Sequence, residues 1–231
     1  MSKHPEPVTA EGTEARHDTR DRILDAGAEL ILGRGFSAVG LAEILGRAQV
    51  PKGSFYYYFG SKEDFGVAML ERYFQDYDAG VVSLFNDTRL TARERLLRYF
   101  TAWIDLHERS ACEVTCLAVK LSGEVSDLSE PMRKVLSTGM TRMVDRIAGV
   151  IEAGVADGSL APVGDARHLA EGLYAMWMGG ALLAKAHRTV AAFRSCVAQT
   201  EILLAKPTHR SQPNPLPARH VPRFFFDSGS R

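Results

Sequence analysis

Apolar residues recur at helical spacing along almost the whole chain, from about residue 18 to residue 206. The clearest stripe lies between about Asp165 and Lys185. On one face of that segment it places Leu169, Leu173, Met176, Trp177, Gly180 and Ala184. No period-two run of β-branched residues is long enough to predict a strand. The sequence therefore predicts an all-α fold.

Glycine and proline divide the first 85 residues into short helices. Gly35 ends the first helix, and Pro51 suits the first turn of the third, where its missing N–H loses no bond. Ser61, three residues before Asp64, is typical of an N-cap and predicts a long helix. The predicted helices are about Thr19–Arg34, Leu41–Ala48, Pro51–Tyr58 and Ser61–Leu84. The tight turn between the second and third predicts a helix-turn-helix.

Composition limits the class of protein. The formal charge is zero, so affinity for nucleic acid must come from a local arrangement of charges. An odd count of three cysteines argues against a disulfide framework and indicates a reducing compartment. No apolar stretch approaches the length of a membrane span, and the first residues do not resemble a signal peptide. We expect a cytoplasmic protein without membrane contact or cofactor, with proline-rich, disordered tails at 1–17 and 207–231.

The third predicted helix carries groups suited to DNA. Small or polar residues at the start of a recognition helix allow close approach, and hydroxyl and ammonium groups donate to phosphates and bases. The residues concerned are Lys52, Gly53, Ser54, Tyr56, Tyr57 and Tyr58, followed by Lys62 at the start of the next helix. Phe55 and Phe59 are expected to pack inward. The alternative is that the tyrosines only cap a small core.

The segment GFSAVGLAEILGRAQVPKGSFYYYFGSKEDF resembles the DNA-binding signature of the TetR family over about 47 residues. The resemblance implies about nine helices, with a helix-turn-helix domain at 18–64 and a helical ligand-binding and dimerisation domain at 65–206. It implies a repressor, not an enzyme, that binds a palindromic double-stranded operator as a homodimer through the helices at about 165–205. The family's DNA-contacting positions match Lys52, Gly53, Ser54, Tyr56, Tyr57, Tyr58 and Lys62.

Two positions depart from the family pattern. Gly40 stands where a threonine usually caps the second helix and contacts phosphate, and Pro51 stands where serine or threonine is common. Both departures put a DNA contact in doubt.

The second half resembles the NemR-like branch, whose members sense electrophiles and oxidants. The resemblance is carried by residues 65–73, by 116–129 and by 177–185. It implies that Cys116 is the sensing residue and that Lys185 is its partner.

Local chemistry also favours a reactive Cys116. Thr115 is a plausible N-cap, which would place Cys116 in the first turn of a helix, with Lys120 one turn later. Both features lower the pKa of a thiol. Lys185 is the only charged residue between Gly172 and Ala186, so it is expected to be desolvated. The alternative is a buried, inert cysteine.

Other roles for these side chains stay open. Cys112, Cys116 and His107 lack a fourth ligand for a metal site, whereas Cys112 is suited to resolve an oxidised Cys116 as a disulfide. Cys196 is expected to pack in the core. An apolar inducer cavity is predicted from Trp103, His107, Met143, Trp177 and Met178, which the same pattern would also place in a plain core. An enzyme with Cys116 as nucleophile would need a base and an oxyanion site that the sequence does not supply.

Overall fold

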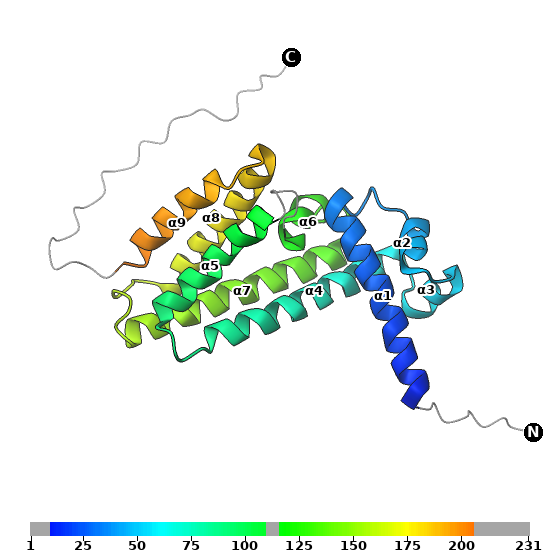
Figure 1. Ribbon diagram of the computed structural model, residues 1–231, viewed down its shortest axis with the longest axis horizontal. Helices are drawn as coiled ribbons and strands as arrows, with labels where there is room; N and C mark the ends of the chain where they lie inside the picture. The colour runs from blue at the N-terminus through cyan, green and yellow to red at the C-terminus, as the bar shows by residue number, and fades with distance from the viewer. Residues whose placement is uncertain (1–9, 110–115, 206–231) are drawn as a thin grey trace, which may run out of the picture.

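The computed structural model describes residues 10–109 and 116–205, and within them it contains nine α-helices and no strand (Figure 1). The all-α prediction is confirmed. The helices are α1 (Ala10–Arg34), α2 (Leu41–Ala48), α3 (Lys52–Tyr58), α4 (Lys62–Phe85), α5 (Ala92–Arg109), α6 (Leu117–Val125), α7 (Glu130–Ala156), α8 (Ala166–His187) and α9 (Ala191–Leu203). The helix α1 begins at Ala10, nine residues earlier than the apolar pattern predicted. Residues 1–9 and 206–231, which include the rest of the predicted tails, lie outside the described residues.

Local signals set the helix ends around the predicted helix-turn-helix. Gly35 adopts a φ of +96° after α1, a conformation that glycine reaches without a Cβ penalty. The Ser61 hydroxyl accepts a hydrogen bond from the backbone N–H of Asp64 at 3.0 Å, as its spacing predicted. Pro51 is the N-cap of α3, one position before the helical turn in which we expected it.

The helices α1, α2 and α3 pack around one core together with α4, α6 and the start of α7. Phe55 and Phe59 are buried in it, which confirms their inward orientation. The Arg22 guanidinium of α1 donates to the carbonyl of Ala48 at 2.6 Å, where α2 ends. This bond fixes the turn that leads into α3, so the angle of α3 depends on α1.

A second core joins α4, α5, α7, α8 and α9. Trp177 is stacked between Phe100 and Phe193, and its indole N–H donates to the Thr200 hydroxyl at 2.9 Å. A Cβ on Gly180 would lie 2.8 Å from the Cys196 sulfur, so this glycine allows α8 and α9 to approach closely. Cys196 is buried in this core, as expected.

The short helix α6 joins the two parts of the molecule. Figure 1 shows it between α1 and the helices of the bundle. It buries Leu117, Ala118, Leu121 and Val125 in the same core as the helix-turn-helix. Cys116, at the start of α6, packs against both cores. Within the described ranges, no helix has the length and apolar character needed to span a membrane.

Candidate DNA-binding surface and sensor pocket

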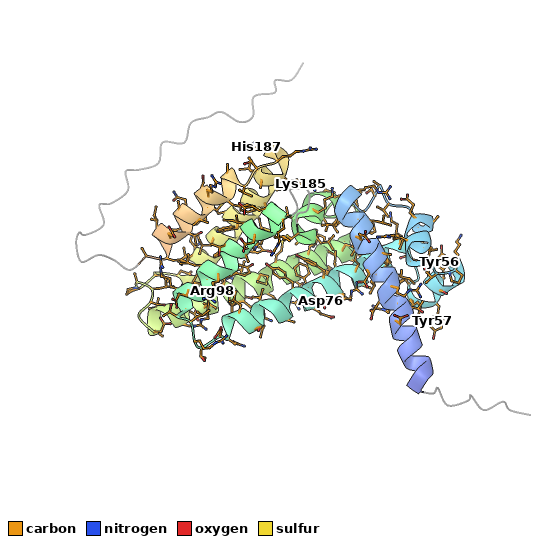
Figure 2. The ribbon with its side chains drawn as sticks, viewed as in Figure 1. Tyr56, Tyr57, Asp76, Arg98, Lys185 and His187 are labelled. Atoms are coloured by element: carbon orange, nitrogen blue, oxygen red, sulfur yellow. The ribbon has the colours of Figure 1, made fainter. Side chains whose placement is uncertain are left out.

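The outer face of α3 presents the side chains that the sequence marked for DNA. Tyr56 and Tyr57 are 54% and 63% exposed, and Lys52 and Gly53 are also exposed. Figure 2 shows both tyrosines at the end of the molecule that α2 and α3 form. Of the three tyrosines, Tyr58 is the one that is partly packed against the core that contains Phe55 and Phe59. Tyr56 and Tyr57 are therefore not buried in the core, and their contact with DNA stays a prediction.

Lys62 has a more internal position than the sequence predicted. Its ammonium group donates to the Phe36 carbonyl at 2.7 Å and lies 4.5 Å from the centre of the Phe36 ring. Burial lowers the pKa of Lys62. Lys62 therefore holds the turn between α1 and α2, and a phosphate contact from its remaining N–H groups stays a prediction.

Gly40 is the N-cap of α2 and supplies no side-chain hydrogen bond there. The cap that the family pattern includes is thus missing from this chain. The backbone at Gly40 has a φ of −83°, which any residue adopts.

Glu124 of α6 binds the turn between α1 and α2, a contact that the sequence did not reveal. Its carboxylate accepts hydrogen bonds from the backbone N–H of Phe36 at 3.1 Å and of Ser37 at 2.7 Å. Burial alone would raise the pKa of Glu124, but these bonds outweigh burial and the pKa is lowered. A Cβ on Gly35 would lie 2.7 Å from the carboxylate, so glycine makes room for it. The bonded groups are far apart in sequence, and no local pattern marks them.

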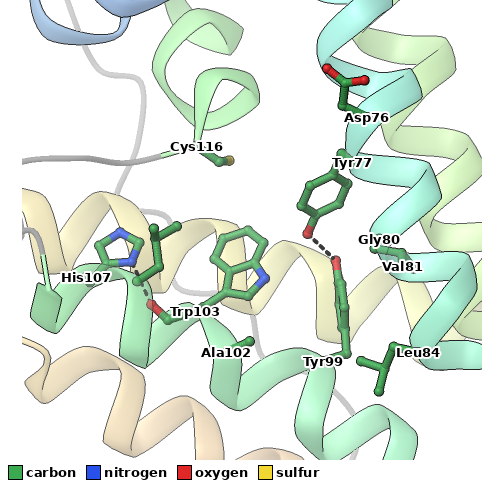
Figure 3. Close-up of a pocket in the computed structure, with 11 residues that line it drawn as sticks. Asp76, Tyr77, Gly80, Val81, Leu84, Tyr99, Ala102, Trp103, His107 and Cys116 are labelled. Carbon is green, nitrogen blue, oxygen red and sulfur yellow. Dashed lines mark hydrogen bonds between the residues drawn. The ribbon is translucent and has the colours of Figure 1, made fainter.

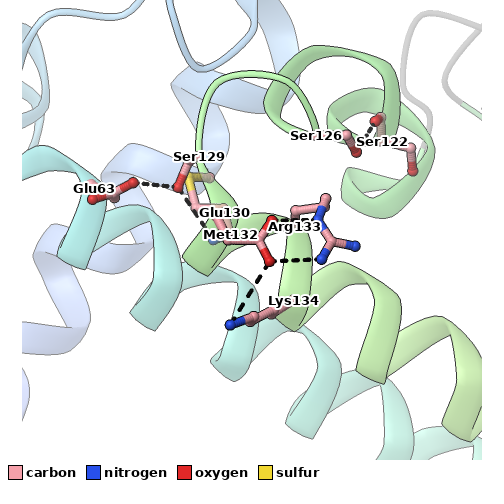
Figure 4. Close-up of polar contacts among 8 residues, drawn as sticks. All are labelled: Glu63, Ser122, Ser126, Ser129, Glu130, Met132, Arg133 and Lys134. Carbon is pink, nitrogen blue, oxygen red and sulfur yellow. Dashed lines mark hydrogen bonds and ion pairs between the residues drawn. The ribbon is translucent and has the colours of Figure 1, made fainter.

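A second contact joins the α6–α7 turn to the start of α4 (Figure 4). The Ser129 hydroxyl donates to the Glu63 carboxylate at 2.6 Å and accepts from the backbone N–H of Met132 at 3.2 Å. Glu130, by contrast, pairs among the described residues only with Arg133 and Lys134 of its own helix. The α6–α7 segment is therefore attached to the DNA-binding end at two points.

A cavity of about 360 Å³ lies between α4, α5 and the start of α6 (Figure 3). Trp103 and His107, two of the residues expected around a cavity, line it, and so does Cys116. Trp177, Met143 and Met178 do not, and Trp177 is fully buried in the aromatic core. The cavity thus lies closer to α4 than we predicted, and binding of an inducer in it stays a prediction.

A second cavity of similar volume lies on the α1 side of α4. It shares part of its lining with the first, namely Asp76, Tyr77, Leu106 and Cys116. Cys116 therefore lies in the walls of both cavities. A group attached to its sulfur would change the packing on both sides of α4.

The thiol of Cys116 has a different environment from the one predicted. Cys116 is itself the N-cap of α6, and its sulfur accepts from the backbone N–H of Val119 at 3.4 Å. Burial raises the pKa of the Cys116 thiol, although bonds from Val119 and the Tyr73 hydroxyl oppose the shift. The prediction of a lowered pKa is therefore wrong, because desolvation outweighs the helix terminus. Thr115 lies outside the described residues.

The two lysines expected beside Cys116 lie close enough to each other for their charges to interact. Burial lowers the pKa of Lys185, and the nearby positive charge of Lys120 lowers it further. The Lys120 charge also acts on Glu124. Neither lysine lines either cavity, and Lys185 lies near the end of α8 (Figure 2). A pairing of Lys185 with Cys116 stays a prediction.

Two further pocket residues were missed from the sequence. The hydroxyls of Tyr77 on α4 and Tyr99 on α5 lie 3.0 Å apart in the wall of the first cavity. Burial raises the pKa of Tyr77 to about 12 and that of Tyr99 well above its usual range, so both phenols are protonated at neutral pH. The sequence signal available for Tyr77 was its spacing of one helical turn from Tyr73, against which its ring is stacked.

No three His, Cys, Asp or Glu side chains gather as a metal site within residues 10–109 and 116–205. Cys112 lies outside these ranges, so neither its pairing with Cys116 nor a metal site that includes it is described.

Two family models match the chain. The model described as "Bacterial regulatory proteins, tetR family" matches residues 23–69. The model described as "Tetracyclin repressor-like, C-terminal domain" matches residues 92–200. The two matches cover both parts of the fold.

Individual relatives extend the similarity over most of the chain. The HTH-type transcriptional repressor NemR of Escherichia coli (strain K12) is 38% identical over 207 residues, which span 90% of this chain and 99% of the relative. The HTH-type transcriptional repressor DhaR of Mycobacterium sp. (strain GP1) is 33% identical over 75% of this chain and 86% of its own length. The crystal structure of E. coli NemR in its reduced form superposes with a TM-score of 0.79 at 40% identity, covering 83% of this chain and 99% of that one.

Proposed function

Because the chain belongs to the TetR family of bacterial transcriptional regulators, we propose that it is a dimeric repressor released from a palindromic operator when an electrophile or oxidant modifies Cys116. The relatives NemR and DhaR are both named transcriptional repressors. Repression by this chain is supported by that similarity and by the exposed face of α3.

Reading of DNA is supported by the exposed face of α3. Arg16 to Lys62 carries seven Lys or Arg residues against five Asp or Glu, so the domain is only slightly basic. The affinity must then come from individual contacts, with Lys52 placed to contact a phosphate and the tyrosine hydroxyls placed to contact phosphates or bases. Two copies of α3 in a two-fold dimer would read the two halves of a palindrome.

Dimerisation is supported by apolar side chains that α8 and α9 leave exposed. They are Leu182, Leu183, Ile202 and Leu203, which are 46% to 67% exposed. These residues lie within the segment, about 165–205, that the family resemblance assigns to the dimer. A two-fold interface places the same patch of both copies face to face.

The observation that carries the sensing proposal is the position of Cys116 at one end of α6. Its sulfur lies in the walls of two cavities, while Glu124 near the other end of α6 binds the helix-turn-helix. Modification adds atoms where α4 and α6 are packed together. The modified dimer favours a geometry in which α4 and α6 shift and the two α3 helices no longer match the operator.

A second candidate function is induction by reversible binding of an apolar molecule, with Cys116 structural. It is favoured by the apolar lining of the first cavity and by burial, which raises the pKa of the Cys116 thiol. A protonated thiol is a weaker nucleophile than a thiolate.

The two candidates are separated by substitution of single cysteines. An operator is first selected from random-sequence DNA, and its complex is then treated with a thiol-reactive probe. We expect Cys116→Ser to keep the operator bound under conditions that release the wild type and the matched control Cys196→Ser. Release from Cys116→Ser at the wild-type concentration of probe would contradict covalent sensing and favour a reversible ligand.

A further inference from the structure

A groove of about 300 Å³ lies between the end of α4, the first turn of α5 and the second half of α7. It shares no lining residue with either of the two cavities beside Cys116. Figure 1 shows this end of α4 on the opposite side of the molecule from α2 and α3. The proposed sensing at Cys116 does not use this groove.

The charges that line the groove are all positive. Of the described residues in its lining, two are arginines, Arg95 of α5 and Arg146 of α7, and none is acidic. A guanidinium is charged at every physiological pH, and its planar set of N–H donors matches the geometry of a carboxylate. The lining therefore favours an anion over a neutral molecule or a cation.

The charge of Arg146 is only partly compensated by the protein. Its Nε donates to one carboxylate oxygen of Asp78 at 3.2 Å, and the Nε of Arg142 lies 3.5 Å from the other oxygen. One carboxylate thus serves two guanidinium groups. The Arg146 side chain is 35% exposed and has N–H groups beyond the one bonded to Asp78.

Arg95 is held in place without a carboxylate bonded to it among the described residues. Its guanidinium donates to the Phe85 carbonyl at the end of α4, while its Nε is buried with no hydrogen-bond partner in the described part of the chain. The charge of Arg95 lowers the pKa of Asp157. The Asp157 oxygens, however, accept from the backbone N–H groups of Ala92 and Ser159. Arg95 is therefore a fixed cation with bonding capacity left.

Gly149 keeps the groove open along α7. Glycine inside a helix is destabilising relative to alanine, so a glycine here needs a reason. Close packing is not that reason, because a Cβ at Gly149 would meet no packing atom within 4 Å. Since Gly149 lines the groove, a larger side chain at this position is expected to obstruct it.

The rest of the wall is largely apolar and is made by Val82, Phe85, Val150 and Ala153. We propose that the groove binds a small organic carboxylate, with its charged group on the guanidinium groups of Arg95 and Arg146 and its apolar part against this wall. Charge-assisted bonds of this kind are stronger than bonds between neutral groups. The volume is sufficient for one aromatic ring, since an apolar cavity of about 150 Å³ binds benzene. This site is separate from Cys116 and does not depend on its chemistry.

Fluorine-detected NMR tests the site with 4-fluorobenzoate and with 4-fluorobenzamide, a neutral analogue of the same shape. Titration of the full-length protein at constant ionic strength gives the Kd of each compound. We expect the benzoate to bind at least about tenfold more tightly than the amide, because a hydrogen bond to a charged group contributes more than one between neutral groups. Equal affinities, or no binding of the benzoate, would overturn the inference.

Arginine variants distinguish contact in the groove from general attraction by positive charge. Arg146→Gln and Arg95→Gln should each weaken binding of 4-fluorobenzoate by about tenfold. The matched control is Arg142→Gln, which removes a charge from the same Asp78 but not from the lining of the groove. Its Kd should stay within about twofold of wild type, because solvent and salt screen a charge that does not touch the ligand. Equal losses in Arg142→Gln and Arg146→Gln would overturn the inference.

A variant that fills the groove keeps the test valid if an arginine variant does not fold. Gly149→Leu retains both arginines and replaces glycine by a better helix former, so the protein should be at least as stable as wild type. We expect this variant to lose binding of 4-fluorobenzoate and Cys116→Ser to bind it with the wild-type Kd. Wild-type affinity in Gly149→Leu, or loss of binding in Cys116→Ser, would place the benzoate elsewhere in the molecule and overturn the inference.

Discussion

Cys116 and Glu124 lie at opposite ends of one helix, with the cysteine as N-cap of α6 and the glutamate as its penultimate residue. A helix of nine residues is about 13 Å long. Along this length, α6 connects the two cavities to the turn between α1 and α2. A displacement at the thiol can therefore reach the helix-turn-helix without a change in the internal bonds of α6.

Glu124→Ala is expected to weaken this connection. The variant loses both acceptors for the N–H groups of Phe36 and Ser37. Cys116 should still be modified at the wild-type rate. The ratio of the operator affinity of unmodified protein to that of modified protein should fall by about fivefold or more. Operator affinity is measured by fluorescence anisotropy before and after modification.

The matched control is Glu130→Ala, which removes a carboxylate paired only within α7. This variant should leave the ratio of the two operator affinities, unmodified to modified, at its wild-type value. Equal loss in both variants would show that α6 is not the connecting element.

Much of the DNA-binding half could be predicted from sequence, because its signals are local. Gly35, the Ser61 cap and the inward Phe55 lie within a few residues of the features they determine. The Glu124 contact could not be predicted in this way, because it joins backbone groups more than 80 residues away.

The pKa of the Cys116 thiol was predicted to shift in the wrong direction for the same reason. Lys120 is its neighbour in sequence, but the lysine charge acts on Lys185 and Glu124. The thiol is surrounded by side chains from other helices, including Tyr73 and Tyr77 of α4, and desolvation there decides its pKa. Helical periodicity shows which apolar residues share one face of a helix, but it does not show which of them surround a particular thiol.

Lys52→Ala is expected to weaken binding to every DNA sequence by a similar factor, because a lysine that neutralises a phosphate carries little sequence information. For a dimer, the slope of log affinity against log salt concentration should decrease by about two, one for each copy. Titrations at several salt concentrations measure this slope. The control Lys134→Ala, an exposed lysine on α7, should keep the wild-type slope, and a wild-type slope in Lys52→Ala would exclude the phosphate contact.

Gly40→Ser is expected to supply the missing cap of α2. A Cβ at Gly40 would meet Glu43 no closer than 3.6 Å, which is ordinary contact. Replacing glycine by serine at an N-cap stabilises a helix by a few tenths of a kcal/mol, about 0.3 kcal/mol here. Gly40→Ala adds the same Cβ without a hydroxyl and serves as the control. Urea unfolding should rank Gly40→Ser above both wild type and Gly40→Ala; a ranking with alanine at or above serine would contradict the cap.

The pH dependence of Cys116 should reveal its burial. Burial raises the pKa of this thiol above its ordinary value of 9.0, and the thiolate is the reactive form. The rate of modification by methyl methanethiosulfonate should therefore keep rising beyond pH 9. A peptide containing residues 113–120, whose one cysteine is Cys116, should level off near the ordinary thiol pKa. A plateau for the folded protein at or below that of the peptide would contradict the environment described for Cys116.

The central claim is that modification of Cys116 itself releases the operator. The most direct measurement follows operator release by anisotropy and occupancy of Cys116 by intact-protein and peptide mass spectrometry in the same samples during treatment with methyl methanethiosulfonate. We predict that release rises in step with occupancy of Cys116 and that dithiothreitol, which removes the added group, restores binding. Full occupancy of Cys116 with the operator still bound, or release before Cys116 is modified, would contradict the account.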